Sequence, residues 1–314
     1  MPGPYAFDPE LQPIVDILPE NDFTDVAAAR KGLDDIIGML SSEVDETAVR
    51  YEDRHVPGPE GAPDVLVRVY TPDERPTPCP ALLDIHGGGF VVGTMAMEHA
   101  GAIAFARNLG IVVVAVEYRL APEHPFPAGI EDCYAALQWL HASAGELGVD
   151  IERIGLYGQS AGGGLAAGLA LLARDRGGPA LCFQFLGIPE LDDRLETPSM
   201  RDFTDTPMWS RPAAVLSWQR YLGGDDRSEV SPYAAPSRAT DLRGLPPAYV
   251  STMEFDPLRD EGILYALALM QAGVQVELHS FPGTFHGSAL LPTAAVSKRA
   301  STEMMDALRR GLKV

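Results

Sequence analysis

The segment RIGLYGQSAGGGLAAGLALLARDR, residues 153–176, decides the fold of this chain. It opens with a short apolar run typical of a buried strand and closes with a run of small residues and leucines typical of a helix. Between them stands Gly158-Gln159-Ser160-Ala161-Gly162, with glycine two residues before and two residues after the serine. A serine exposed on a sharp strand-to-helix turn needs such neighbours, because larger side chains would fill the turn. The alternative is a glycine-rich turn with an idle serine, and the strand before and helix after favour a nucleophile.

Around this segment, short apolar runs alternate with longer helical patterns, as in a mainly parallel sheet covered on both faces. The expected strands are 51–57, 65–71, 81–85, 111–117, 153–157, 182–187, 248–252 and 276–281. The first two read as a hairpin joined by the turn at 57–61. The expected helices are 98–109, 128–147, 161–176, 212–221, 259–272 and 294–312. The sequence thus predicts an α/β protein with an eight-stranded sheet.

Two segments lie outside this alternation. Near the N-terminus, Thr24 and Asp25 can cap an amphipathic helix. Its apolar face carries Val26, Ala29, Leu33, Ile36, Ile37 and Leu40. The second segment, residues 189–243, is rich in Pro, Asp, Arg and aromatic residues and contains no convincing strand. We expect it to be an insertion at the carboxyl ends of the strands, where open α/β sheets place their ligand sites.

The charge of the chain limits its partners. The 314 residues include 44 acidic and 24 basic side chains, a formal net charge of -20. An acidic surface repels phosphate backbones and anionic lipids, so we expect no nucleic acid and no membrane partner. The three cysteines, Cys79, Cys133 and Cys182, lack disulfide-framework or metal-site spacing, and we expect them reduced and buried. The first residues lack a signal-peptide pattern, which favours a cytoplasmic protein.

A second motif, His86-Gly87-Gly88-Gly89-Phe90, follows the expected strand 81–85 directly. Consecutive glycines allow backbone N–H groups to converge on one point, which is what an oxyanion requires. A flexible loop or a phosphate cradle is the alternative interpretation. A nucleotide-binding phosphate loop is disfavoured, because the motif has neither a following Lys-Ser/Thr nor the glycine spacing of dinucleotide-binding loops.

Chain order places the acid and the histidine of such a site after the serine. Of the seven histidines only His279 and His286 follow Ser160, and His279 lies inside the expected strand 276–281. His286 lies beyond it, in what we expect to be a loop over residues 282–287. For the acid, Asp256 follows strand 248–252 and precedes a proline. Its rivals are Glu254, close to the strand, and Asp260 and Glu261, which resemble first-turn charges of the next helix.

Five motifs in this order resemble the hormone-sensitive-lipase family of bacterial carboxylesterases, also called family IV esterases. They are His86-Gly-Gly-Gly-Phe90, Tyr118-Arg-Leu-Ala-Pro-Glu123, Gly158-Gln-Ser-Ala-Gly-Gly163, Asp256-Pro-Leu-Arg-Asp-Glu-Gly262 and Phe285-His-Gly287. The similarity extends over about residues 51–314. It implies an α/β-hydrolase fold with a helical cap and hydrolysis of short- to medium-chain acyl esters without a cofactor or metal. The cap would comprise residues 1–45 and 189–243, and the core residues 46–188 and 244–314.

The resemblance also assigns roles. It implies that Ser160 is the nucleophile, His286 the base and then acid, and Asp256 the orienting carboxylate. The backbone N–H groups of Gly88, Gly89 and Ala161 would bind the oxyanion. The expected substrate-binding residues are Phe90, Met208, Trp209, Leu258 and Phe285. Met208 and Trp209, with Phe203, are alternatively cap core. Arg119 and Glu123 are expected to form a buried structural ion pair.

Two positions depart from the family pattern. Gln159 stands where Asp or Thr is usual before the serine, and Ser288 stands where Phe is usual after His-Gly. They affect the local hydrogen bonds and the pocket wall, and leave the expected triad intact.

Two other functions stay open at this stage. A non-catalytic receptor on the same fold, like the gibberellin receptors of plants, is disfavoured because such receptors lack the histidine present here as His286. An amidase or a deacetylase of one metabolite would share every motif. The expected partner is a small-molecule ester, and homodimer formation is left open.

Overall fold

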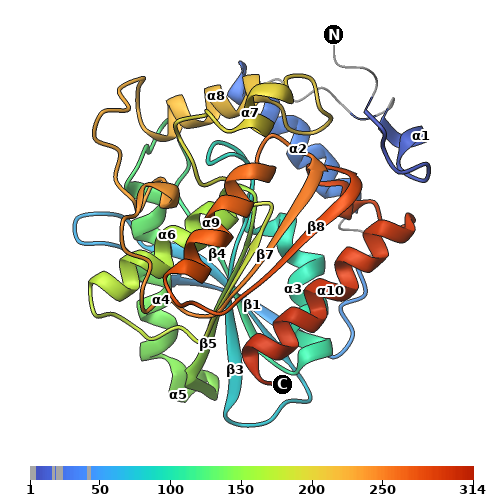
Figure 1. The fold of residues 1–314 in the computed structure, drawn as a ribbon. Coiled ribbons are helices and arrows are strands. Elements are labelled where there is room, and N and C mark those ends of the chain that lie inside the picture. The colour runs from blue at the N-terminus through green and yellow to red at the C-terminus, as the bar shows by residue number, and fades with distance from the viewer. Residues whose placement is uncertain (1–4, 16–17, 19–23, 41–43) are drawn as a thin grey trace.

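The computed structural model describes residues 5–15, 18, 24–40 and 44–314, leaving out the side chains of residues 34–40 and 290. Eight strands of this part form one sheet (Figure 1). Their bounds are β1 Val49–Val56, β2 Val65–Pro72, β3 Cys79–Ile85, β4 Val112–Glu117, β5 Val149–Gln159, β6 Phe183–Gly187, β7 Ala248–Phe255 and β8 Val276–Phe285. The spatial order is β1-β2-β4-β3-β5-β6-β7-β8. The expected eight-stranded sheet is confirmed.

The sheet is antiparallel at one edge and parallel elsewhere. β1 pairs with β2, and β2 with β4, in antiparallel register, with Val56 opposite Val65 at the hairpin end. From β4 onward, each neighbouring pair in the order β4-β3-β5-β6-β7-β8 is parallel. The carboxyl ends of β3, β5, β6, β7 and β8 therefore meet at one edge of the sheet, where open α/β sheets bind ligands.

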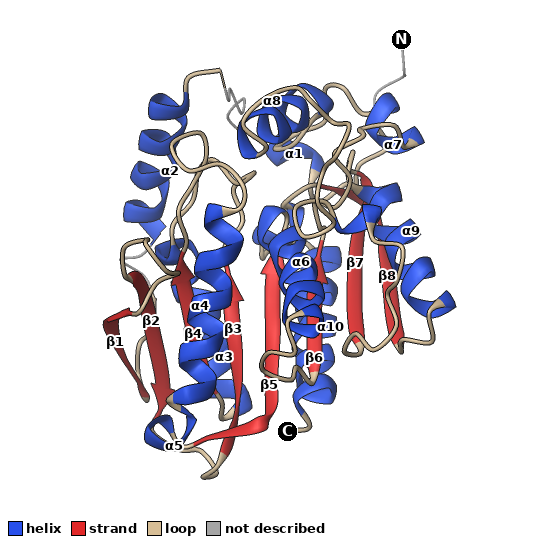
Figure 2. Cartoon of the chain, turned by 90° about the vertical axis from the view of Figure 1, so that its left-hand side faces the viewer, coloured by secondary structure: helices blue, strands red, loops and turns tan. Residues whose placement is uncertain are grey.

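Helices cover both faces of the sheet (Figure 2). The helices are α1 Gln12–Val15, α2 Val26–Leu40, α3 His99–Leu109, α4 Ala128–Ala142, α5 Ala144–Leu147, α6 Ala161–Asp175, α7 Pro198–Asp202, α8 Arg211–Tyr221, α9 Arg259–Gln271 and α10 Ala295–Leu312, with short 3₁₀ turns at Met95–Glu98, Pro236–Arg238 and Ser288–Leu290. Residues of α4, α6 and α9 join one buried apolar cluster on the sheet, and residues of α3 and α10 join another on the opposite face. No helix of the described part is long and apolar enough to cross a membrane.

Some boundaries differ from those expected from sequence. The helix expected over 128–147 ends at Ala142 and resumes at Ala144, because the backbone of Ser143, with φ -89° and ψ 4°, departs from helical geometry. β7 and β8 extend to Phe255 and Phe285, where these two residues pair after an irregularity. Residues 282–285, expected in a loop, are therefore strand. Among the cysteines, all free, Cys79 and Cys133 are buried as expected but Cys182 is only half-buried.

The helix predicted near the N-terminus is α2. The Asp25 carboxylate accepts a hydrogen bond from the Ala28 N–H, as expected of a cap, and Val26, Ala29 and Leu33 pack on the core. The side chains of Ile36, Ile37 and Leu40 lie outside the described residues. Figure 2 shows α7 and α8 above the carboxyl ends of the strands, with α2 beside them. The division of the chain into cap and core remains a prediction.

The ion pair expected between Arg119 and Glu123 is not formed. Arg119 binds Asp132 of α4 through two guanidinium contacts of 2.8 Å, and Asp132 also accepts the Arg119 backbone N–H. Glu123 is exposed and pairs with Arg30 of α2 at 2.8 Å. Arg30 also donates to the carbonyls of Val91 and Ala121. The sequence expectation failed because partners distant in sequence, on α2 and α4, compete for these side chains.

Candidate active site

Ser160 stands on the sharp turn that its flanking glycines predict. β5 ends at Gln159 and α6 begins at Ala161, so Ser160 alone makes the turn, with φ 56° and ψ -125°. A Cβ on Gly158 would lie 2.2 Å from the Gly162 carbonyl oxygen, and one on Gly162 would lie 2.0 Å from that of Ile85. No larger residue fits at either position. The motif has the backbone geometry of a nucleophile elbow, and this turn is called the elbow below.

Three side chains from three strand ends meet at this turn. His286, directly after β8, places Nε2 3.0 Å from the Ser160 Oγ. Its Nδ1 lies 2.8 Å from the Oδ2 of Asp256, the residue after β7. All three side chains are buried, and Asp256 is fully inaccessible. The structure thus brings together the serine, histidine and carboxylate selected from the sequence.

The proton positions follow from the partners. Ionised Asp256 can only accept, so the Nδ1 of a neutral His286 carries the hydrogen and Nε2 is left to accept from the Ser160 hydroxyl. The second oxygen of Asp256 accepts the Leu258 N–H at 2.9 Å. The carboxylate is therefore held at both oxygens and fixes the orientation of the imidazole ring.

The glycine loop after β3 lies against the elbow. A Cβ on Gly87 would be 3.0 Å from the Gln159 carbonyl oxygen and 3.5 Å from the Ser160 Cβ, which shows how closely the two backbones approach. Gly88 and Gly89 have φ values of 114° and 56°, which favour glycine. A Cβ on Gly88 would also lie 2.1 Å from the Val92 carbonyl oxygen. The loop can therefore present its N–H groups beside Ser160 only as a glycine run.

His86 at the start of this loop is structural. Its ring stacks on Tyr118 at 4.1 Å, its Nδ1 lies 2.8 Å from the Gly87 carbonyl, and Tyr118 donates to the His86 carbonyl. Burial lowers the pKa of His86 to about 4, so it is neutral at physiological pH. A neutral Nδ1–H donating to Gly87 braces the glycine loop.

The residues expected to bind substrate have different surroundings. The Trp209 ring lies 5.7 Å from the His286 ring and touches the position that a Cβ on Gly89 would take. Phe90 stacks on Tyr221 at 3.9 Å, and Phe285 contacts Phe7 edge-on at 5.3 Å. These two side chains and that of Leu258 are buried in the core, whereas Met208 is half-buried. Trp209 is the one whose ring lies beside both His286 and Gly89, and all five stay predictions as pocket residues.

The rival candidates have other partners. Glu254 lies inside β7 and accepts the Gly283 N–H at 2.7 Å. Asp260 accepts the Ser199 N–H, while His279 lies 2.9 Å from Glu277. Glu277, His279 and Glu303 form the single group of three possible metal ligands in the described part of the chain. Arg310 already occupies Glu277 with contacts of 2.8 and 2.7 Å.

Two buried carboxyl groups beside the site were not selected from the sequence. Glu190 follows β6 by three residues, and its backbone N–H donates to the Ser160 carbonyl at 3.1 Å. Glu261, interpreted above as a helix-opening charge, is buried and accepts the N–H groups of Leu191 and Asp192. Burial raises the pKa of Glu190 to about 8 and that of Glu261 well above its ordinary value. A signal for Glu190 was present: an acidic residue just past a strand at the ligand-binding edge.

The two departures from the family pattern have defined environments. Gln159 is half-buried, and its Nε2 donates to the Tyr157 hydroxyl at 2.6 Å. Ser288 is buried, and its carbonyl accepts the Ser297 hydroxyl of α10 at 2.9 Å. Gln159 thus braces the face covered by α3 and α10, and Ser288 links the His286 loop to α10.

The arrangement of Ser160, His286 and Asp256 fits a catalytic triad on an α/β sheet, the class of serine-dependent hydrolases. The α/β-hydrolase fold family matches residues 82–290 of the sequence. The chain belongs to this family.

Three relatives illustrate the similarity. The carboxylesterase NlhH of Mycobacterium tuberculosis is 43% identical over 273 residues, which cover 84% of this chain and 83% of the relative. An ethyl acetate hydrolase of Pseudomonas putida is 32% identical over 272 residues, 80% of this chain and 85% of the relative. Among solved structures, a bacterial heroin esterase is 57% identical, with a TM-score of 0.96 and 98% of both chains covered.

Proposed function

We propose that this carboxylesterase hydrolyses small carboxylic esters through an acyl-enzyme on Ser160. Family membership and relatives named as esterases support the reaction class. The observation that carries the mechanism is the continuous chain of contacts from Asp256 to His286 to Ser160, at 2.8 and 3.0 Å. Such a chain serves to activate a hydroxyl nucleophile.

In the acylation step, Ser160 Oγ attacks the ester carbonyl carbon while His286 Nε2 takes the hydroxyl proton. The Gly88, Gly89 and Ala161 N–H groups bind the oxyanion that forms. Asp256 stabilises the resulting imidazolium without taking its proton. His286 then gives the proton to the leaving alkoxide, and the alcohol departs.

Deacylation repeats these steps with water. His286 takes a proton from the water molecule, whose oxygen attacks the acyl carbon, and returns that proton to Ser160 Oγ as the ester bond breaks. The products are a carboxylic acid, an alcohol and the free enzyme. Water is the one co-reactant that the balance requires.

We propose short- to medium-chain acyl groups as the preferred substrates. The resemblance in sequence implies this range, and the similarity to an ethyl acetate hydrolase supports its short end. Trp209 beside His286 and Gly89 gives the site an apolar wall, which suits a short acyl group.

The test is a kinetic profile over p-nitrophenyl esters of increasing acyl length, with the matched p-nitroanilides, for the wild type and Ser160→Ala. We expect kcat/KM to be highest for short or medium esters and far lower for anilides. The alanine variant should lose about a millionfold in kcat while remaining folded, and mass spectrometry should find the trapped acyl group on Ser160 in the wild type. Retention of more than a few per cent of activity by Ser160→Ala would refute the assignment of Ser160 as the nucleophile.

A further inference from the structure

Ser217 of α8 connects the cap with the glycine loop. Its Oγ lies 2.8 Å from the Gly89 carbonyl oxygen and 3.1 Å from Glu190 Oε1, and all of these groups are buried beside the active site. Glu190 is also tied to the nucleophile through its N–H bond to the Ser160 carbonyl. Glu190 therefore contacts the elbow through its backbone, while its carboxyl group contacts the cap helix and, through Ser217, the loop expected to bind the oxyanion.

The number of hydrogen atoms available to Ser217, Gly89 and Glu190 determines which group donates in each contact. Ser217 has one hydroxyl hydrogen, and both the Gly89 carbonyl and an ionised Glu190 are pure acceptors. If Ser217 donates to Gly89, at the shorter distance, an ionised Glu190 leaves two oxygens facing each other without a hydrogen. If Glu190 carries a proton, it donates to Ser217, and both contacts become hydrogen bonds.

The surroundings of Glu190 favour the protonated form. Its side chain is fully inaccessible, and Oε2 has no hydrogen-bond partner within the described part of the chain. The titratable groups that face it are Asp256 directly after β7, Glu261 of α9 and Tyr221 of α8, which are negatively charged in their ionised forms. Burial raises its pKa to about 8; the contact with Ser217 opposes this rise, and the charge of Asp256 adds a smaller increase.

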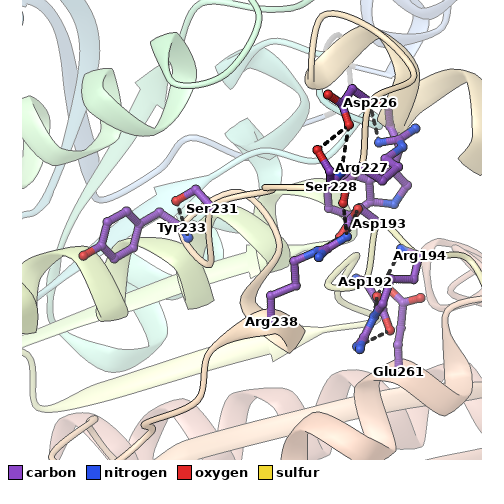
Figure 3. Close-up of polar contacts among 11 residues, drawn as sticks. Asp192, Asp193, Arg194, Asp226, Arg227, Ser228, Ser231, Tyr233, Arg238 and Glu261 are labelled. Atoms are coloured by element: carbon purple, nitrogen blue, oxygen red, sulfur yellow. Dashed lines mark hydrogen bonds and ion pairs between the residues drawn. The ribbon is translucent and has the colours of Figure 1, made fainter.

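The main chain that carries Glu190 is held by a separate polar network (Figure 3). Glu261 accepts the N–H groups of Leu191 and Asp192, and the buried Asp193 pairs with Arg238 at 2.6 Å. These contacts fix the main chain directly after Glu190.

We propose that Glu190 is a positioning residue of the oxyanion loop, acting as a carboxylic acid that donates to Ser217, which in turn donates to the Gly89 carbonyl. The Gly89 carbonyl and N–H lie in two peptide planes that meet at the Gly89 Cα, so holding the carbonyl restricts rotation of this residue and thereby supports the orientation of its N–H. Loss of the Glu190 proton disconnects the relay and loosens this donor. This proposal rests on the proposed function, because it assumes an oxyanion formed at Ser160.

The test compares Glu190→Gln, Ser217→Ala and the wild type, using kcat and KM for p-nitrophenyl acetate between about pH 6 and 9.5. The matched controls lie in the same segment, residues 189–243. They are Glu229→Gln, at an exposed residue, and Ser210→Ala, at a residue whose hydroxyl makes no capping bond to α8. Active-site titration with a fluorophosphonate normalises each rate to the Ser160 that reacts. The wild type and both controls should lose kcat at alkaline pH as Glu190 ionises.

The glutamine amide donates at every pH, so Glu190→Gln should keep kcat within about twofold of wild type at neutral pH and lose the alkaline decline. Ser217→Ala should lower kcat about tenfold with little change in KM, less than the 10²–10³-fold cost of deleting an oxyanion donor. An alkaline decline that persists in Glu190→Gln, or a wild-type kcat in Ser217→Ala, would overturn the relay. Failure of wild-type Ser160 to react with the titrant would instead contradict the proposed function.

Discussion

The backbone of Ser160 offers a test of how far the active site is strained for function. Its φ of 56° and ψ of -125° lie in a region that residues with a Cβ rarely occupy. Replacing Ser160 with alanine or with glycine removes the hydroxyl group and its contact to His286 in both cases. The difference in stability between the two variants therefore isolates the strain of the Cβ at this turn.

The magnitude follows from two opposing effects. A strained conformation of this kind costs about 1–3 kcal/mol, which glycine relieves. Glycine also loses more backbone entropy on folding, about 0.5–1 kcal/mol relative to alanine. We expect Ser160→Gly to be more stable than Ser160→Ala by about 1 kcal/mol, or about 1.5 °C in Tm for a chain of 314 residues.

The assay is urea denaturation of both variants, followed by fluorescence, with differential scanning fluorimetry as a second measure. Ser143, half-buried with φ -89° and no capping bond from its side chain, is the matched control. At Ser143 the order should reverse, with alanine about 0.5–1 kcal/mol more stable than glycine. The argument from backbone strain is refuted if Ser160→Gly is no more stable than Ser160→Ala.

Two further predictions concern stability. Because folding raises the pKa of Glu190 from 4.5 to about 8, the contribution of its proton to the free energy of unfolding is complete below about pH 4.5 and is lost as pH rises to about 8. In urea denaturation, the wild type should lose up to about 4 kcal/mol of stability over this pH window relative to Glu190→Gln. Parallel plots of stability against pH for the two proteins would contradict the assignment. Arg30→Met should destabilise the protein by about 1–2 kcal/mol, because the variant loses the ion pair with Glu123 and two hydrogen bonds to backbone carbonyls. The loss should be smaller at high salt, since the ion pair is partly exposed. An unchanged denaturation curve at low salt would show that α2 is held by apolar contacts alone.

The sequence determined most of the sheet and the identities of the triad candidates. Local patterns suffice for these features. An apolar run precedes Gly158, small residues surround Ser160 and a helical pattern follows, and together they predict a strand, a sharp turn and a helix. Chain order then restricted the histidine to two positions and favoured Asp256 as the acid. All eight strands were located, with errors at their ends. The ends of β7 and β8 were missed because the pairing of Phe255 with Phe285 depends on a neighbouring strand.

Only the tertiary structure decided which side chains act together. The partners of Arg119 and Glu123 lie on α4 and α2, so a motif that holds both residues could not reveal that they bind elsewhere. Glu190 and Ser217 are 27 residues apart, and Ser217 and Gly89 are 128 residues apart, yet they form one chain of contacts. Such contacts arise when α8 packs on the strand ends, and burial there changes the proton affinity of Glu190. Sequence periodicity records which face of an element is apolar, whereas the proton-bearing groups around a site are set by the packing of distant segments.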